Sequence, residues 1–277
     1  MTMAMAAQGR FRAAWLAAAA CAGVMTTLLA GCALPAKEQQ DTISQMVTPS
    51  EESDARKRAR IRLELASGYY GEGKTEIALD ELKQVIATDP TFGEAYNLRG
   101  LIYMRLGDNR EAEESFKRAV AMNPRDADTQ HNYGWFLCQE GRYPDAQRAF
   151  DVAMANPMYA GRAKTLMTQG VCQARAGRLE DAERSLSRSY ELDAGNPVTG
   201  YNLARLLYQR GDYARAQFYI RRLNNTELAN AESLWLGVRV ERRLNDQLAM
   251  RQLGDQLKKR FASSREAAAY DRGAFDD

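Results

Sequence analysis

The residues that could carry chemistry in this sequence are few, and none of them completes a catalytic set. Residues 68–75 match the phosphate-binding pattern G-x-x-x-x-G-K-[ST]. That loop cradles phosphate only between a buried strand and a helix start, whereas residues 59–66 favour helix and are rich in Arg. His131 is the only histidine. No nucleophile or acid accompanies it in a recognisable motif, and no Cys/His spacing is typical of a metal site.

We therefore expect no enzyme, no cofactor, no metal and no nucleotide. The composition argues in the same way against nucleic acid. The sequence holds 38 basic and 36 acidic side chains, for a net charge of +2 over 277 residues, and nucleic-acid binding normally needs a strongly basic surface. Pro is scarce, at 7 residues, the composition favours helix, and no strand-like alternation of appreciable length occurs. The chain is predicted to be all-α.

Cys32 follows a segment with the order of a secretory signal peptide. Arg10 and Arg12 precede an apolar, mostly Ala run at residues 13–30. The run leads into Leu-Ala-Gly-Cys at residues 29–32, which resembles the bacterial lipobox at every position. The resemblance implies cleavage before Cys32 and acylation of that residue. A transmembrane anchor is the alternative, but the run is short and weakly apolar for a membrane span.

The lipobox also sets the expected location. Ala33, and not Asp, follows the cysteine, which by the rules of bacterial lipoproteins implies forwarding to the outer membrane. Two or three acyl chains hold a protein firmly, since each buried methylene contributes about 0.8 kcal/mol. We expect a signal peptide at 1–31, the lipidated Cys32 with a flexible tether at 32–56, and a lipid-anchored, periplasm-facing domain.

A regular internal repeat organises the rest of the chain. Five glycines recur at nearly constant intervals, and five alanines keep the same intervals. The period, about 34 residues, is that of the tetratricopeptide repeat (TPR), a pair of helices. Glycine is predicted to end each first helix, because a residue without a Cβ adopts a positive φ most easily. Alanine is predicted to face inward from each second helix. The positions are Gly73, Gly107, Gly141, Gly177, Gly211 and Ala78, Ala112, Ala146, Ala182, Ala216.

The predicted fold is a right-handed superhelical solenoid of about six TPR helix pairs at residues 57–264. The sixth unit is degenerate, which suits a terminal cap that faces water on one side. Residues 265–277 are weakly apolar and are expected to form a loose tail. The predicted units lie at about 59–92, 93–126, 127–162, 163–196, 197–229 and 230–264.

Cys138 and Cys172 lie one repeat period apart, on the predicted first helices of the third and fourth units. Since neighbouring first helices of such a stack pack side by side, the two sulfurs can approach one another. Export would place them in an oxidising compartment. They are a candidate disulfide, and two separately buried thiols are the alternative.

Positions 5, 9 and 12 of each unit are expected to face a concave groove lined by the first helices. This set is unusually apolar for a surface, which is typical of a binding site and favours a peptide with hydrophobic anchors. The alternative is that neighbouring units or the tail cover these side chains. The candidate groove residues are Asn97, Leu101, Met104, His131, Trp135, Met167, Val171, Tyr201, Arg205 and Tyr208.

Together these features resemble one family, the type IV pilus biogenesis and stability lipoproteins. The resemblance rests on the lipobox, the tether, the helix pairs, the run His-Asn-Tyr-Gly-Trp-Phe-Leu-Cys at residues 131–138, and Cys172. Tyr-Asn-Leu-Arg-Gly at 96–100 and Tyr-Asn-Leu-Ala at 201–204 also match, although such residues are shared by other TPR proteins.

The resemblance implies a pilotin-like role. Such a protein helps the pilus secretin reach the outer membrane and form a multimer, and so supports pilus biogenesis and twitching motility. The implied partners are the secretin or another protein of the pilus machinery, and the membrane through the lipid anchor. The alternatives are a general periplasmic adaptor that recruits a protease or cell-wall enzyme, and a subunit of another outer-membrane assembly machine.

Overall fold

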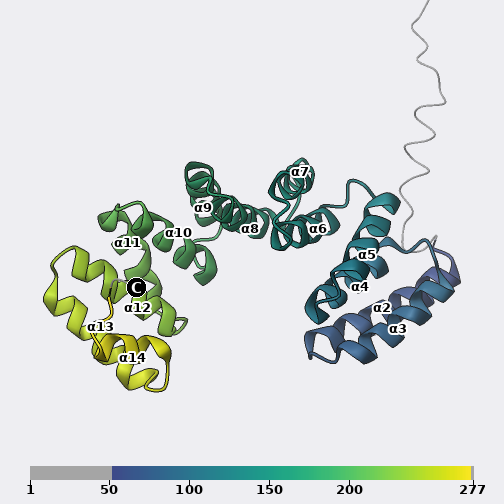
Figure 1. Ribbon diagram of the computed structural model, residues 1–277. Helices are drawn as coiled ribbons and strands as arrows, with labels where there is room; N and C mark the ends of the chain where they lie inside the picture. Colours follow the sequence, from purple (N-terminus) through teal and green to yellow (C-terminus); the bar gives the residue numbers. More distant parts are fainter. Residues whose placement is uncertain (1–51, 276–277) are drawn as a thin grey trace, which may run out of the picture. The chain divides into compact units, whose positions relative to one another are not determined.

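The computed structural model describes residues 52–275, which form thirteen α-helices and no strand (Figure 1). The all-α prediction is confirmed for this part of the chain. Twelve of the helices form six consecutive pairs, and one short helix follows. The bounds are α2 (Asp54–Gly71) and α3 (Thr75–Thr88), α4 (Gly93–Leu106) and α5 (Asn109–Met122), α6 (Ala127–Gln139) and α7 (Tyr143–Met154), α8 (Arg162–Arg175) and α9 (Leu179–Leu192), α10 (Pro197–Gln209) and α11 (Tyr213–Asn224), α12 (Ala231–Arg243) and α13 (Gln247–Arg260), and α14 (Arg265–Asp271).

A turn with one left-handed residue joins the two helices of every pair. The five repeat glycines have φ between 73° and 80°, a conformation that costs least without a Cβ. In the second pair, the Asp108 N–H donates to the Tyr103 carbonyl (3.0 Å) and closes α4. The Asp108 carboxylate then accepts from the Glu111 N–H and caps α5. Asn245, with φ 60°, takes the glycine's place in the sixth pair.

Small residues set how closely the two helices of a pair approach. A Cβ on Gly100 would lie 2.8 Å from the Phe116 ring, and one on Gly134 would lie 2.8 Å from the Phe150 ring. Both phenylalanines are fully buried. The five repeat alanines are also fully buried, as expected for the inner face of the second helices: Ala78, Ala112, Ala146, Ala182 and Ala216.

The first helices of successive pairs form one continuous row. Each of α2, α4, α6, α8 and α10 contacts the next first helix, up to α12. Among the described helices, the backbones of second helices do not approach one another closely, although side chains do meet, as between Arg215 of α11 and Glu183 of α9 (2.7 Å). The face made by α2, α4, α6, α8, α10 and α12 is called the first-helix face below. It is the face on which the sequence places the groove.

The solenoid begins earlier than the sequence predicted. Ser53 accepts a hydrogen bond from the Arg56 N–H (3.2 Å) and caps α2, which therefore starts at Asp54. The tether predicted to reach residue 56 ends before that helix. The signal peptide, Cys32 and most of the tether lie outside the described residues. None of the described helices combines the length and the apolar character that a membrane span requires.

Residues 265–271 were expected to be part of a loose tail, and the structure corrects this. They form α14, which Ser264 caps by accepting from the Ala267 N–H (3.1 Å). The helix packs on α12 and α13 and buries Ala267 against Leu234 and Leu257. Its sequence is only weakly apolar because a short helix that covers one end needs few apolar side chains.

Candidate protein-binding surface

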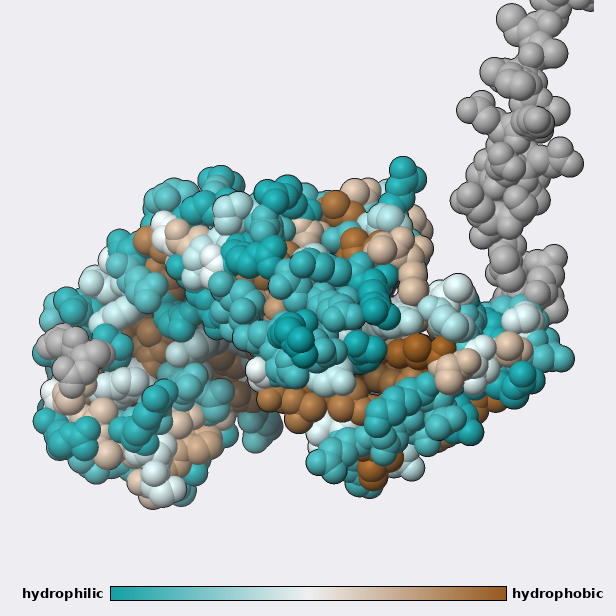
Figure 2. Space-filling view, turned by 45° about the vertical axis from the view of Figure 1, so that its right-hand side comes forward, coloured by the Kyte–Doolittle hydropathy of each residue, from teal (hydrophilic) through white to brown (hydrophobic). Residues whose placement is uncertain are grey.

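All ten predicted groove residues lie on first helices, but they differ in exposure. Eight are half-buried, His131 is buried and Arg205 is exposed. Several of the half-buried side chains also pack against the core, among them Leu101, Trp135 and Met167. All seven apolar or aromatic members of the half-buried set pack against the core in this way, so each side chain stabilises the stack with one part of its surface and leaves the other part accessible. The space-filling view shows apolar residues in the recessed part of one face, with hydrophilic residues around them (Figure 2).

His131 does not belong to the accessible surface, contrary to the prediction. It is only 3% exposed, and its Nδ1 lies 2.9 Å from the Thr165 hydroxyl on α8. Burial, and to a smaller extent the charge of Lys164, lower the pKa of His131 to about 4. The ring is thus neutral at neutral pH and joins α6 to α8 in the interior.

Asn97 and Trp135 lie where neighbouring first helices meet. The Asn132 side-chain amide donates to Asn97 Oδ1 (3.1 Å), which links α6 to α4. The Arg175 guanidinium on α8 lies 5.2 Å from the centre of the Trp135 ring on α6. Polar and cation–π contacts of this kind fix the orientation of half-buried side chains. Trp135 is therefore presented in a defined position on the first-helix face.

The structure brings Cys138 and Cys172 together as a disulfide. Their Cα atoms lie 5.8 Å apart, within the range that the bond requires, and both residues are buried. The bridge connects α6 to α8, two adjacent first helices. The repeat spacing predicted that these two cysteines can approach one another from adjacent first helices.

Three predicted residues, Tyr201, Arg205 and Tyr208, line one cavity with side chains from α12 and α14. Its volume is about 440 Å³. We call it the α10–α12 cavity. Sequence reasoning missed its other half, although the repeat points to it: Trp235 and Arg239 lie one repeat period after Tyr201 and Arg205. The remaining lining residues are Gln209, Glu232, Leu236, Arg265 and Glu266.

Comparison with known families settles what the helix pairs are. The tetratricopeptide-repeat family matches residues 63–127, 98–160, 137–197 and 173–234. The chain belongs to the tetratricopeptide-repeat family. This match, with the helix pairs described above, confirms the predicted TPR solenoid.

Two relatives of this TPR protein carry names from the type IV pilus system. The type IV pilus assembly protein PilF of Pseudomonas aeruginosa is 26% identical over 204 residues, which cover 74% of this chain and 81% of the relative. The PilF structure superimposes with a TM-score of 0.71 over 79% of this chain and 99% of the other. PilW, described as a widely conserved type IV pilus biogenesis factor, is 29% identical, with a TM-score of 0.72 over 76% and 97%.

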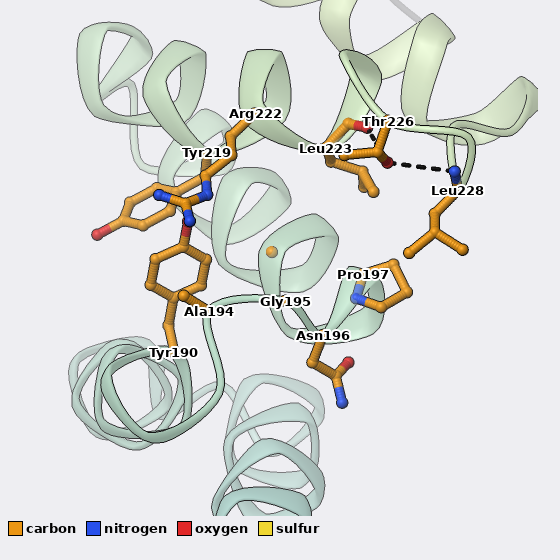
Figure 3. A pocket seen from close by; sticks show the side chains of 11 residues that line it. Tyr190, Ala194, Gly195, Asn196, Pro197, Tyr219, Arg222, Leu223, Thr226 and Leu228 are labelled. Carbon is orange, nitrogen blue, oxygen red and sulfur yellow. Dashed lines mark hydrogen bonds between the residues drawn. The ribbon is translucent and has the colours of Figure 1, made fainter.

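A second, smaller cavity of the TPR protein lies between the α9–α10 turn, the start of α10 and the end of α11 (Figure 3). Its volume is about 170 Å³, the space of one side chain. The rings of Tyr190 and Tyr219 meet edge to face at 5.0 Å, and the Arg222 guanidinium lies 5.9 Å from the Tyr190 ring. On the other side, Thr226 donates to the Leu223 carbonyl (2.8 Å).

Two patterns that could have carried other chemistry are resolved by the structure. The phosphate-loop pattern at 68–75 forms no such loop, because helix α2 precedes it, where a strand would be required, and Gly73 occupies the turn of the first pair. Within residues 52–275, no group of three or more His, Cys, Asp or Glu side chains could hold a metal ion. The first-helix face instead offers half-buried apolar, aromatic and arginine side chains.

Proposed function

We propose that this TPR protein binds protein partners through its first-helix face and promotes the localisation and multimerisation of the type IV pilus secretin. In this role it supports pilus biogenesis and stability. The observation that carries the proposal is the likeness to PilF and PilW, which spans nearly the whole length of both solved structures. The presence of accessible aromatic side chains on the first-helix face supports binding as the mode of action.

The proposed function is binding and not catalysis. A solenoid stacks its units so that each contacts only its neighbours, and it offers an extended surface to a partner. The one histidine is buried and neutral, so it is not available as a general base at the surface. The half-buried Trp135, Tyr201 and Tyr208 suit anchoring, since aromatic residues are enriched at the centres of protein interfaces.

The proposed location is the outer membrane, with the TPR domain facing the periplasm. Its support is the lipobox at residues 29–32. Replacing Cys32 by Ala removes the acceptor of the lipid, so the variant is expected to leave the outer-membrane fraction. The measurement is membrane fractionation followed by immunoblotting, with Cys138→Ala as a control that keeps the anchor. Normal outer-membrane fractionation of Cys32→Ala would contradict the proposed anchor.

Deletion of the gene tests the function directly. The secretin is expected to lose its heat-stable multimer in outer-membrane fractions, and surface pili and twitching are expected to be lost. Gel mobility of the secretin, electron microscopy and motility assays measure these outcomes, with complementation by the wild-type chain as the control. If the multimer and the pili persist in the deletion strain, the proposed function is wrong and a general adaptor role takes its place.

The first-helix face is tested by Trp135→Ser in the complemented strain. Secretin multimers are expected to fall while the purified variant keeps its helical circular dichroism spectrum. The matched control is Phe218→Ser, because Phe218 is an exposed aromatic residue on the second helix α11, at 59% exposure. Full secretin assembly by a folded Trp135→Ser variant would remove Trp135 from the binding surface.

A further inference from the structure

The α10–α12 cavity combines aromatic walls with two arginines that form no ion pair with the described part of the chain. Tyr201, Tyr208 and Trp235 supply the aromatic surface. Arg239 Nε is buried and makes no hydrogen bond with the described residues. The Arg205 guanidinium donates only to a neutral group, the Asn202 side-chain carbonyl (3.1 Å).

The acidic side chains of the cavity are already paired. Arg265 contacts Glu232 at 3.4 Å and Glu266 at 2.7 Å. Neither Arg205 nor Arg239 forms an ion pair within residues 52–275. The lining holds three arginines and two glutamates, an excess of one positive charge, and Arg205 and Arg239 are the two guanidinium groups that no carboxylate contacts directly. Arg239 is half-buried, and a charged donor that is partly removed from water is costly unless an acceptor arrives.

Aromatic rings hold both guanidinium groups in place. The Arg239 guanidinium lies 5.0 Å from the centre of the Tyr208 ring, and the Arg205 guanidinium lies 5.9 Å from that of Tyr201. A guanidinium held over a ring keeps its N–H edge free for a planar acceptor, and a carboxylate matches that edge with two parallel hydrogen bonds. The cavity thus favours a carboxylate next to the aromatic walls.

One aromatic side chain of the protein itself already packs on the aromatic wall of the cavity. Phe275 stacks on Trp235 with ring centres 5.6 Å apart. Phe275 lies in the turn after α14, where its N–H donates to the Gly273 carbonyl (3.0 Å), so a non-helical segment already places an aromatic side chain against Trp235 at the border of the cavity. The cavity volume, about 440 Å³, lies within the range of ligand pockets and accommodates two adjacent side chains.

We propose that the α10–α12 cavity binds a short extended segment of a protein partner in which a carboxylate side chain adjoins an aromatic one. Arg205 and Arg239 hold the carboxylate, and Tyr201, Tyr208 and Trp235 hold the ring. The inference deepens the proposed function and rests on it for the identity of the partner. It goes beyond the apolar groove of the sequence prediction by adding a charge requirement at the last two helix pairs.

The test uses the full-length lipoprotein in detergent micelles and fluorescence polarisation. The probe is a fluorescein-labelled, amide-capped peptide, Gly-Ser-Phe-Asp-Ser-Gly, compared with the same peptide carrying Asn for Asp or Ala for Phe. Each replacement is expected to weaken binding about tenfold, as loss of a charge-assisted hydrogen bond or of an aromatic anchor does. Equal affinities for the Asp and Asn peptides would overturn the proposal.

Two variants assign the effect to the cavity. Arg239→Gln and Arg205→Gln are each expected to bind the Asp peptide about tenfold more weakly and to treat the Asp and Asn peptides alike. Arg205 is exposed, so its replacement leaves packing intact if Arg239→Gln fails to fold. The matched control is Arg251→Gln, an exposed arginine on α13 outside the cavity, which is expected to bind as the wild type does.

Retention of the wild-type preference for Asp by Arg205→Gln would overturn the site. The deletion experiment separates this result from the proposed function. Loss of secretin multimers in the deletion strain with no peptide discrimination overturns the cavity alone. Peptide discrimination with normal multimers in the deletion strain supports the cavity and overturns the pilus role alone.

Discussion

Glycines on the first helices show how a single missing atom sets the spacing of a pair. A Cβ on Gly134 would meet the Phe150 ring at 2.8 Å, whereas a Cβ on Gly68 of α2 would meet nothing within 4 Å. The same residue type therefore has opposite consequences at two helical positions. One glycine is needed for packing, and the other only weakens its helix.

Replacing Gly134 by Ala is expected to lower the free energy of unfolding by about 1–3 kcal/mol, since the added methyl forces the buried ring to shift. Replacing Gly68 by Ala is expected to raise it by about 0.5–1 kcal/mol through helix propensity. Urea denaturation followed by circular dichroism measures both. Similar effects of the two substitutions would show that the close approach at Gly134 is not limiting.

The burial of His131, the only histidine of the chain, makes the free energy of unfolding depend on pH. Its pKa in the folded state, about 4, lies below the ordinary value of 6.5. The unfolded chain therefore takes up the proton first. The stability from the neutral ring is complete above pH 6.5 and is lost as the pH falls towards 4.

The wild type is expected to lose about 2 kcal/mol of unfolding free energy between pH 7 and pH 5. His131→Gln is expected to be less stable at pH 7 but nearly flat over the same range, since Gln does not titrate. Urea titrations at several pH values, with NMR titration of the histidine ring, provide the measurement. An ordinary histidine pKa near 6.5 in the folded protein would contradict the buried placement.

At the scale of helices, contacts of different kinds join neighbouring pairs. The Cys138–Cys172 disulfide connects α6 to α8. Between α11 and α12, the fully buried Glu241 accepts hydrogen bonds from Arg221 Nε (2.6 Å) and from the Gln217 amide (2.7 Å). Since each pair contacts only its neighbours, every such link stabilises one interface of the stack.

Removing the disulfide is expected to act mainly on the third and fourth pairs. The bridge joins residues that lie one repeat apart in the chain, so Cys138→Ala/Cys172→Ala is expected to cost about 2–4 kcal/mol. Urea denaturation with and without dithiothreitol measures this, and dithiothreitol should leave the double variant unchanged. Two free thiols in the unreduced wild-type chain, counted after denaturation, would show that the bridge does not form.

At the scale of the whole molecule, stability is local because the described residues contain no contact between distant helix pairs. The last pair therefore depends on what covers its outer side. Helix α14 does so: it places Ala267 and Tyr270 against Leu234 and Leu257. A solenoid needs such a cap, since an uncovered terminal unit would expose its apolar face to water.

Deleting residues 265–277 is expected to speed amide hydrogen exchange in α12 and α13 and to leave α4 and α5 unchanged. The physical reason is that Leu234 and Leu257, now fully buried, become exposed to water. Hydrogen exchange followed by mass spectrometry measures the effect by segment. The control is Arg272→Ala, an exposed position beyond α14. Uniform acceleration over all pairs would contradict local stability.

The sequence by itself determined the period, the helix pairs and their turns. Glycine at the left-handed position and alanine at the inner face are local requirements, so they recur with the chain and are visible without a structure. The same periodicity placed Cys138 and Cys172 on adjacent helices. It would also have found Trp235 and Arg239, had the period been extended from Tyr201 and Arg205 into the degenerate sixth unit.

Only the tertiary structure decided which face residues are accessible. His131 and Trp135 lie one helical turn apart on α6. His131 nevertheless contacts Thr165 in the interior, whereas Trp135 is half-buried. Helix α14 was hidden as well, because its helix depends on docking and not on its own apolar pattern. Burial and charge pairing depend on what the neighbouring helices supply, and that is fixed by packing between pairs, not by the residues of one repeat.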